Sequence, residues 1–288
     1  MYKKLFISFL LIVSVQLSFV NVVDKTSSEQ LDKAFSRSLT VFAIARSLNG
    51  LISVVQGTEV YATPAGVGVN FAVGQIVDPM NDMLERFSWI MLMSAVSLGT
   101  QEILLHFGQT QPVQGFLALS VIILLFFLWI PKFWHRESFN LIFKSFVIFS
   151  FLRFTVPLIV LINEGVYEYG LKEQYEKAKA SLEATQAQTE VIVEQVRHNQ
   201  KQQNSSWMDS LNLKQQVEGF RIKTEASWVN LKNKFNYAID YMLSLISIFV
   251  MQSILLPLLF LWLFLKLFRK FMSIDIGDII ENKTIKNV

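Results

Sequence analysis

Two residues with the chemistry for proton transfer lie one helical turn apart inside an apolar stretch. Glu102 and His106 both occur in the run WIMLMSAVSLGTQEILLHFG, residues 89–108, and would share one face of a helix. A carboxylate beside an imidazole can relay protons, or supply two of the ligands that a metal ion needs. Because the chain has only 3 histidines, a zinc site would need carboxylates from elsewhere. We predict no metal site and no cofactor. The alternative role for the pair is structural hydrogen bonding.

Arg153 lies inside another apolar run, with Pro157 one turn further on. An arginine at the centre of a membrane costs on the order of 3 kcal/mol on insertion scales, unless it meets a partner or water. Glu102 is the candidate partner, so Glu102, His106 and Arg153 form one candidate intramembrane polar cluster. The alternative is that Arg153 faces the interior of a helix bundle and holds two helices together.

A glycine-rich stretch, PAGVGVNFAVGQIVDP, extends from Pro64 to Pro79. It does not match a dinucleotide fingerprint, because Phe71 stands where the third glycine is required. Bulky and small residues alternate with a period of two, which predicts an extended segment with one nearly bare face. Such a face permits close approach of another backbone. The candidate close-packing or pore-lining residues are Gly66, Gly68, Asn70 and Gly74.

Other catalytic signatures are missing from the sequence. It contains no G-x-S-x-G elbow and no H-E-x-x-H motif. The absence of cysteine rules out disulfides, thiolate metal sites and cysteine nucleophiles. A net charge of +3, scattered along the chain, argues against the clustered phosphate contacts of a nucleic-acid surface. We therefore predict a protein that is not an enzyme, with no catalytic residues and no nucleic acid partner.

The composition predicts an all-α integral membrane protein. Of the 288 residues, 52% are hydrophobic, and the mean hydropathy is +0.40, more than one soluble core of this length needs. The predicted parts are a signal peptide or signal anchor (1–23), an extracytoplasmic amphipathic helix with the glycine-rich segment (24–88), a membrane domain (89–163) with a partial span (89–108) and two spans (115–131 and 141–162), an extracytoplasmic helical hairpin (164–236), a transmembrane helix (237–266) and a cytoplasmic tail (267–288).

Basic residues beside the apolar runs indicate the orientation of the chain. Lys132 and Arg136 mark one cytoplasmic loop, and the run KLFRKF after the last span marks another. This scheme requires that residues 89–108 do not cross completely. It predicts a multi-pass protein of a bacterial inner membrane, with residues 164–236 periplasmic or extracellular.

Apolar residues in the hairpin region recur at spacings of three and four, which predicts a coiled-coil-like seam on each arm. The first seam is Leu171, Tyr175, Ala178, Leu182, Thr185, Thr189, Ile192 and Val196, and the second runs from Leu213 to Leu231 and continues through Ala238, Met242 and Leu245. A similar stripe, from Val41 to Val55, predicts that the helix before the glycine-rich segment is amphipathic.

These features favour a non-enzymatic assembly or scaffold subunit of an envelope complex. The apolar residues of a seam are stable when another helix covers them, so we expect the hairpin to mediate self-association or docking. The expected partners are the lipid bilayer and either further copies of the chain or another envelope protein; no ligand is identified. Two alternatives stay open: an oligomeric channel lined by residues 64–108, and an intramembrane proton relay or enzyme that uses Glu102, His106 and Arg153.

Overall fold

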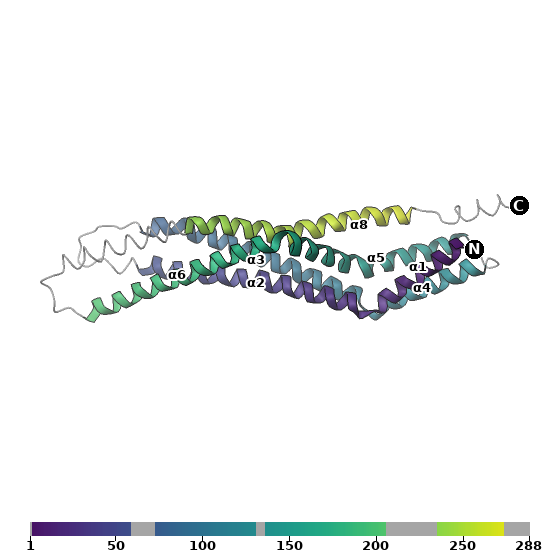
Figure 1. Ribbon diagram of the computed structural model, residues 1–288, viewed down its shortest axis with the longest axis horizontal. Helices are drawn as coiled ribbons and strands as arrows, with labels where there is room; N and C mark the ends of the chain where they lie inside the picture. The colour runs from purple at the N-terminus through teal and green to yellow at the C-terminus, as the bar shows by residue number, and fades with distance from the viewer. Residues whose placement is uncertain (1, 59–72, 131–135, 206–234, 274–288) are drawn as a thin grey trace. The chain divides into compact units, whose positions relative to one another are not determined.

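The computed structural model describes residues 2–58, 73–130, 136–205 and 235–273. These residues are almost entirely helical and include no strand, which confirms the predicted all-α class. In chain order, the elements are α1 (Tyr2–Phe19), α2 (Asn21–Thr58), α3 (Val73–Gly108), α4 (Gln111–Trp129), α5 (Arg136–Val166), the π-helix η3 (Tyr167–Leu171), α6 (Lys172–Ser205), a helix over 235–250, the π-helix η4 (Met251–Leu255) and α8 (Leu256–Met272) (Figure 1).

Four helical runs in the described part of the chain are long and apolar enough to cross a membrane. They are Pro79–Gly108, Gln111–Trp129, Glu137–Glu194 and Phe235–Met272. They coincide with the three predicted spans, except that the second run ends at Trp129 and Pro131 of the span 115–131 lies outside the described residues. The chain therefore has the features of a membrane protein. Residues 89–108, predicted as a partial span, belong to the 30-residue run that begins at Pro79. By length and composition this longer run qualifies as a full span. The N-terminal segment meets the test only together with α2, from which it is bent by 50°.

The glycine-rich stretch enters the described structure only at its end. Gly66, Gly68 and Asn70 lie in the range 59–72, outside the described residues. Gly74 lies in the first turn of α3, so the extended conformation predicted for residues 64–79 is wrong from Val73 onward. Pro79 removes one main-chain hydrogen bond from this helix. The helix persists because its next turns bury an apolar face made of Met80, Leu84, Phe87 and Met91.

The chain forms two compact units, and the first comprises Met1–Phe35, Val96–Glu168 and Gln252–Val288. In this unit α4 packs against α1 and α5, and α5 packs against α8. Lys4 near the start of α1 donates a hydrogen bond to the carbonyl oxygen of Leu128 at the end of α4, with an N···O distance of 3.2 Å. Helices α1 and α4 are therefore antiparallel neighbours (Figure 1).

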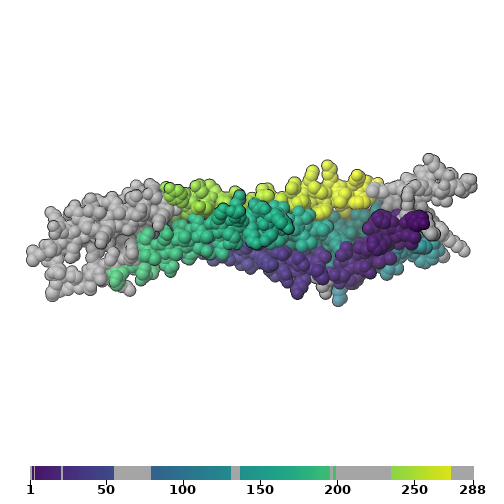
Figure 2. Space-filling view, viewed as in Figure 1, coloured from purple at the N-terminus to yellow at the C-terminus, as the bar shows by residue number. Residues whose placement is uncertain are grey.

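Apolar contacts dominate the rest of the first unit. One buried cluster joins α2, α3 and α5; its members are Leu31, Ala34, Leu98, Leu105 and Val160. The aromatic rings of Phe151 and Phe268 connect α5 with α8, with centroids 4.9 Å apart. No residue of α8 is buried, and exposed leucines and Trp262 lie along it. Helix α8 forms a yellow surface in Figure 2. This surface has the apolar character that lipid contact requires.

The second unit comprises Ser36–Ala95 and Tyr169–Met251. The amphipathic stripe predicted on α2 is buried, as expected, at Val41, Ile44, Ala45, Leu48 and Ile52. Ser38 of α2 donates a hydrogen bond to the carbonyl oxygen of Met91 in α3, at 2.9 Å. On α6, Gln186 donates to the hydroxyl of Ser47 in α2, at 3.0 Å, and the ring of Tyr175 lies edge-on to Phe249, at 5.9 Å between centroids. Helix α6 thus contacts elements of its own chain.

The buried residues of α6 follow the predicted seam for most of its length. They are Tyr175, Ala178, Leu182, Thr185, Thr189 and Val193. The prediction is wrong at the end, where Ile192 is half-buried and Val193 takes the buried position. Val193 lies 18 residues after Tyr175, and five intervals separate the six residues. The mean interval is therefore the 3.6-residue period of a straight helix rather than the 3.5 of a supercoil. The second arm stays a prediction, because residues 206–234 lie outside the described residues.

Two valines on α6 test this corrected face. Val193 is 2% exposed and Val191 is 56% exposed, so the same substitution should have different effects at the two sites. We expect Val193→Ala to lower the free energy of unfolding by about 1.5 kcal/mol, since it deletes two buried methyl groups. Val191→Ala should change it by less than about 0.5 kcal/mol. Equilibrium unfolding in detergent measures both, and equal losses would contradict the assigned face.

Candidate functional site

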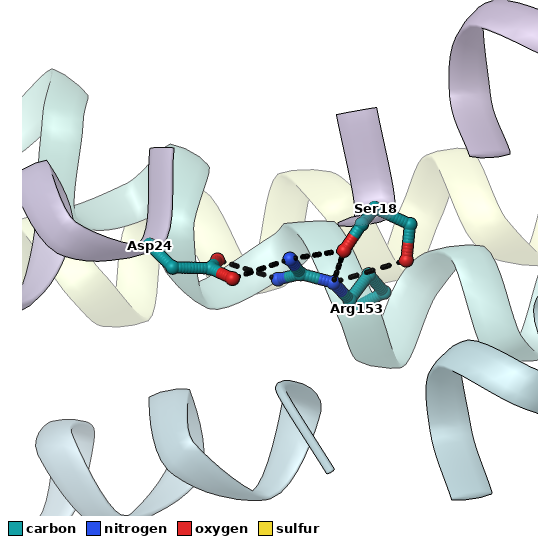
Figure 3. A network of polar contacts seen from close by, with 3 residues as sticks. All are labelled: Ser18, Asp24 and Arg153. Carbon is teal, nitrogen blue, oxygen red and sulfur yellow. Dashed lines mark hydrogen bonds and ion pairs between the residues drawn. The ribbon is translucent and has the colours of Figure 1, made fainter. Parts of the chain in front are cut away.

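Arg153 lies in the interior of the first unit and joins three helices (Figure 3). Its side chain is 1% exposed. The two terminal nitrogens of the guanidinium donate to the carboxylate of Asp24 in α2, at 2.7 Å (Nη1 to Oδ1) and 2.6 Å (Nη2 to Oδ2). Nη2 also donates to the carbonyl oxygen of Ser18 in α1 at 2.8 Å, and Nε lies 3.2 Å from both that oxygen and the Ser18 hydroxyl.

The break between α1 and α2 supplies both partners of Arg153. It falls at Val20, where β-branched valines have low helix propensity and Asn21, which favours helix starts, begins α2. The carbonyl of Ser18 loses its helical partner at the end of α1, and Asp24 stands in the first turn of α2. A cation at a helix C-terminus and an anion at an N-terminus are both favourable. Arg153 therefore donates both to the free carbonyl at the end of α1 and to the carboxylate at the start of α2.

The end of α3 is pressed against the backbone of Arg153. A Cβ atom added to Gly108 would lie 2.7 Å from the carbonyl oxygen of Leu152 and 3.7 Å from the Cα of Arg153. Contact at this distance requires a residue without a side chain. Ser18, Asp24, Gly108 and Arg153 therefore form one junction, which we call the arginine junction.

A second polar site surrounds η4. A π-helix shifts its main-chain hydrogen bonds from i+4 to i+5, which leaves carbonyl groups for other donors. The carbonyl of Ser253 accepts hydrogen bonds from the Ser97 hydroxyl at 2.6 Å and the Gln101 amide at 3.1 Å. The carbonyl of Gln252 accepts one from the Asn163 amide at 2.7 Å. We call these five residues the π-helix site.

The structure does not assemble the polar cluster that the sequence suggested. Arg153 pairs with Asp24, so the expectation that Glu102 is its partner is wrong. His106 is exposed, and its Nδ1 lies 2.9 Å from the main-chain oxygen of Glu102, a contact between neighbouring turns of one helix. The pore-lining role of Gly66, Gly68 and Asn70 stays a prediction, since those residues lie outside the described residues. Among the described residues, no group of three or more His, Cys, Asp or Glu could hold a metal ion.

Sequence reasoning missed Asp24 and Ser18 as partners, and Asn163 and Gln252 as site residues. In the sequence, Asp24 simply follows the N-terminal apolar run and Ser18 lies inside it, so neither position signals a buried pairing. Gln252 carried a usable signal, because a neutral amide inside a long apolar run needs a partner. No protein family model, curated protein or solved structure matches this chain.

Proposed function

We propose that this protein is a non-enzymatic, multi-pass membrane subunit that acts as an assembly scaffold in an envelope complex. The observation that carries this proposal is the use made of Arg153. A buried charge in a membrane segment is a functional candidate by default, yet the hydrogen bonds that place this guanidinium connect one helix to two others of the same chain. Hydrogen bonds that link three helices in this way fit a protein that keeps its helices in fixed positions for other proteins to bind.

We assign docking to exposed side chains of η3, α6 and the helix over 235–250 rather than to the seam of α6. That seam is buried within the second unit, which removes the reason for expecting it to bind a partner. Outward residues offer apolar contacts instead: Tyr169 is 94% exposed and Tyr237 is 70% exposed. Tyrosine is enriched in protein interfaces. Exposed ion pairs such as Lys177 with Glu173 suit a surface of α6 that faces water.

The scaffold is placed in a bacterial inner membrane, with the basic flanks at Lys132, Arg136 and Lys266 in the cytoplasm and residues 164–236 outside. This arrangement requires that the run Pro79–Gly108, although long and apolar enough to span, does not cross the membrane completely. In this arrangement α1 is a retained anchor rather than a cleaved signal. Three contacts support retention: Arg153 to Ser18, Lys4 to Leu128, and Trp129 to Ser8 at 3.2 Å. Removal of residues 1–23 would leave the donors of Arg153 without Ser18.

Native mass spectrometry of the full chain, purified in mild detergent, tests these statements together. The expected result is a complex of fixed stoichiometry, built from several copies or from one copy with another envelope protein. The subunit mass should include residues 1–23. A strict monomer without any bound protein would overturn the scaffold proposal, and a subunit that lacks these residues would overturn the retained anchor.

A further inference from the structure

The π-helix site contains two side-chain amides of which only the nitrogen end is used. Asn163 Nδ2 donates to the carbonyl of Gln252, and Gln101 Nε2 donates to that of Ser253. These carbonyls fix the orientation of both amides, since the reverse orientation would set oxygen against oxygen. The remaining atoms, Asn163 Oδ1 and Gln101 Oε1, are buried and accept no hydrogen bond from any described residue. Asn163 is only 7% exposed.

The chemistry of the two oxygens defines what they bind. Both are acceptors, and a buried acceptor without a donor is costly, so the ligand must donate hydrogen bonds. An anion is therefore excluded. A hard cation takes six or more oxygens, whereas the carbonyls of Gln252 and Ser253 are already occupied by donors. Water offers two hydrogens to two acceptors and needs no countercharge.

We propose that the π-helix site binds an ordered water molecule, which donates one hydrogen bond to Asn163 Oδ1 and one to Gln101 Oε1. The two amides donate to the carbonyls of successive residues of η4, and from this shared anchor we infer that one water reaches both oxygens. Irregular backbone in a membrane segment persists where protein or water satisfies its polar groups. Asn163 and Gln101 meet that requirement for two carbonyls of η4, and the water meets it in turn for the buried side-chain oxygens of these two residues.

Water-edited solid-state NMR on the isotope-labelled full chain in lipid bilayers tests the proposal. Magnetisation is transferred from water protons to the side-chain amides of Asn163 and Gln101. We expect both to receive it several-fold faster than the backbone amides of Leu98 and Leu105, which lie on the same helix as Gln101 and belong to the apolar cluster. Transfer as slow as at these leucines, at either amide, would overturn the bridging water.

Two further measurements separate water from its competitors. Replacing sodium with choline in the buffer should leave the amide chemical shifts of Asn163 and Gln101 unchanged; a shift would overturn water in favour of a bound cation. The Asn163→Leu variant should slow the transfer to Gln101 at least two-fold. An unchanged rate in a variant that keeps the wild-type spectrum elsewhere would show that the two amides do not share one water.

Discussion

Arg153→Met is expected to lower the free energy of unfolding by about 3–5 kcal/mol, the largest loss that we expect from any single substitution in this chain. The substitution leaves the carboxylate of Asp24 buried without its counter-ion, and breaking a buried pair from one side costs this much. It also removes the donors to the Ser18 carbonyl. Equilibrium unfolding of the full chain in detergent measures the loss.

The double variant Arg153→Met with Asp24→Leu distinguishes two contributions to that loss. One is the stability that the ion pair itself provides, and the other is the cost of leaving Asp24 buried and unpaired. Because desolvation opposes a buried ion pair, removing both charges is often neutral, and we expect the double variant to recover most of the stability. Recovery should be incomplete, since the carbonyl of Ser18 still lacks a donor. Arg46→Met is the matched control, because Arg46 is exposed on α2 and lies 5.5 Å from the ring of Phe42. We expect this control to lose less than about 1 kcal/mol.

Two outcomes would contradict the arginine junction. If Arg153→Met and Arg46→Met cost the same, Arg153 does not stand in a buried pair. If the double variant is less stable than Arg153→Met, Asp24 contributes through contacts other than the arginine. In contrast, Arg153→Lys should fall between wild type and methionine, because a lysine keeps the charge but cannot form the two parallel hydrogen bonds of a guanidinium.

Composition and periodicity were sufficient to predict the helices but not their interruptions. Apolar runs such as residues 115–131 can be recognised as spans from the sequence, because a span must be apolar over its whole length. The buried face of α6 was also predictable up to Thr189, since burial on one side imposes a period on the sequence. The π-helix η4 was not predicted, because its freed carbonyls are satisfied by donors from other helices, here Ser97, Gln101 and Asn163. The spacing within residues 251–255 carries no such information.

The same distinction applies to the arginine junction. That Arg153 needs a partner follows from its type and its apolar surroundings, and this much the sequence predicted. Which carboxylate it meets depends on a helix break at Val20, just before Asp24, and Asp24 lies 129 residues before Arg153 in the chain. Residues 5–23 form one apolar run in the sequence, and only the packed structure divides this run by a break at Val20, which places Asp24 in the first turn of α2. Glu102 was nearer in sequence and equally acidic, so residue type alone favoured the wrong partner.

Gly108→Ala is expected to cost about 2–3 kcal/mol relative to the matched variant Gly115→Ala. At Gly108 the new methyl group would lie 2.7 Å from the carbonyl oxygen of Leu152, and backbone cannot move aside as a side chain can. Helices α3 and α5 would therefore have to separate at the arginine junction, an overpacking cost of this size. At Gly115 in α4 nothing lies within 4 Å of an added Cβ.

The comparison between the two glycines removes the general effect of the substitution. Alanine favours a helix over glycine by up to about 1 kcal/mol, and both glycines are helical, so Gly115→Ala should be neutral or stabilising when unfolding is measured in detergent. A Gly108→Ala variant that gains the same stability would contradict the close approach of α3 to α5. Gly108 also lies against the main chain of Arg153. Gly108→Ala should therefore lower the free energy of unfolding by less in the Arg153→Met background than in the wild-type protein. The double-mutant cycle would then give a coupling energy above about 0.5 kcal/mol, as expected if glycine and arginine act as one junction.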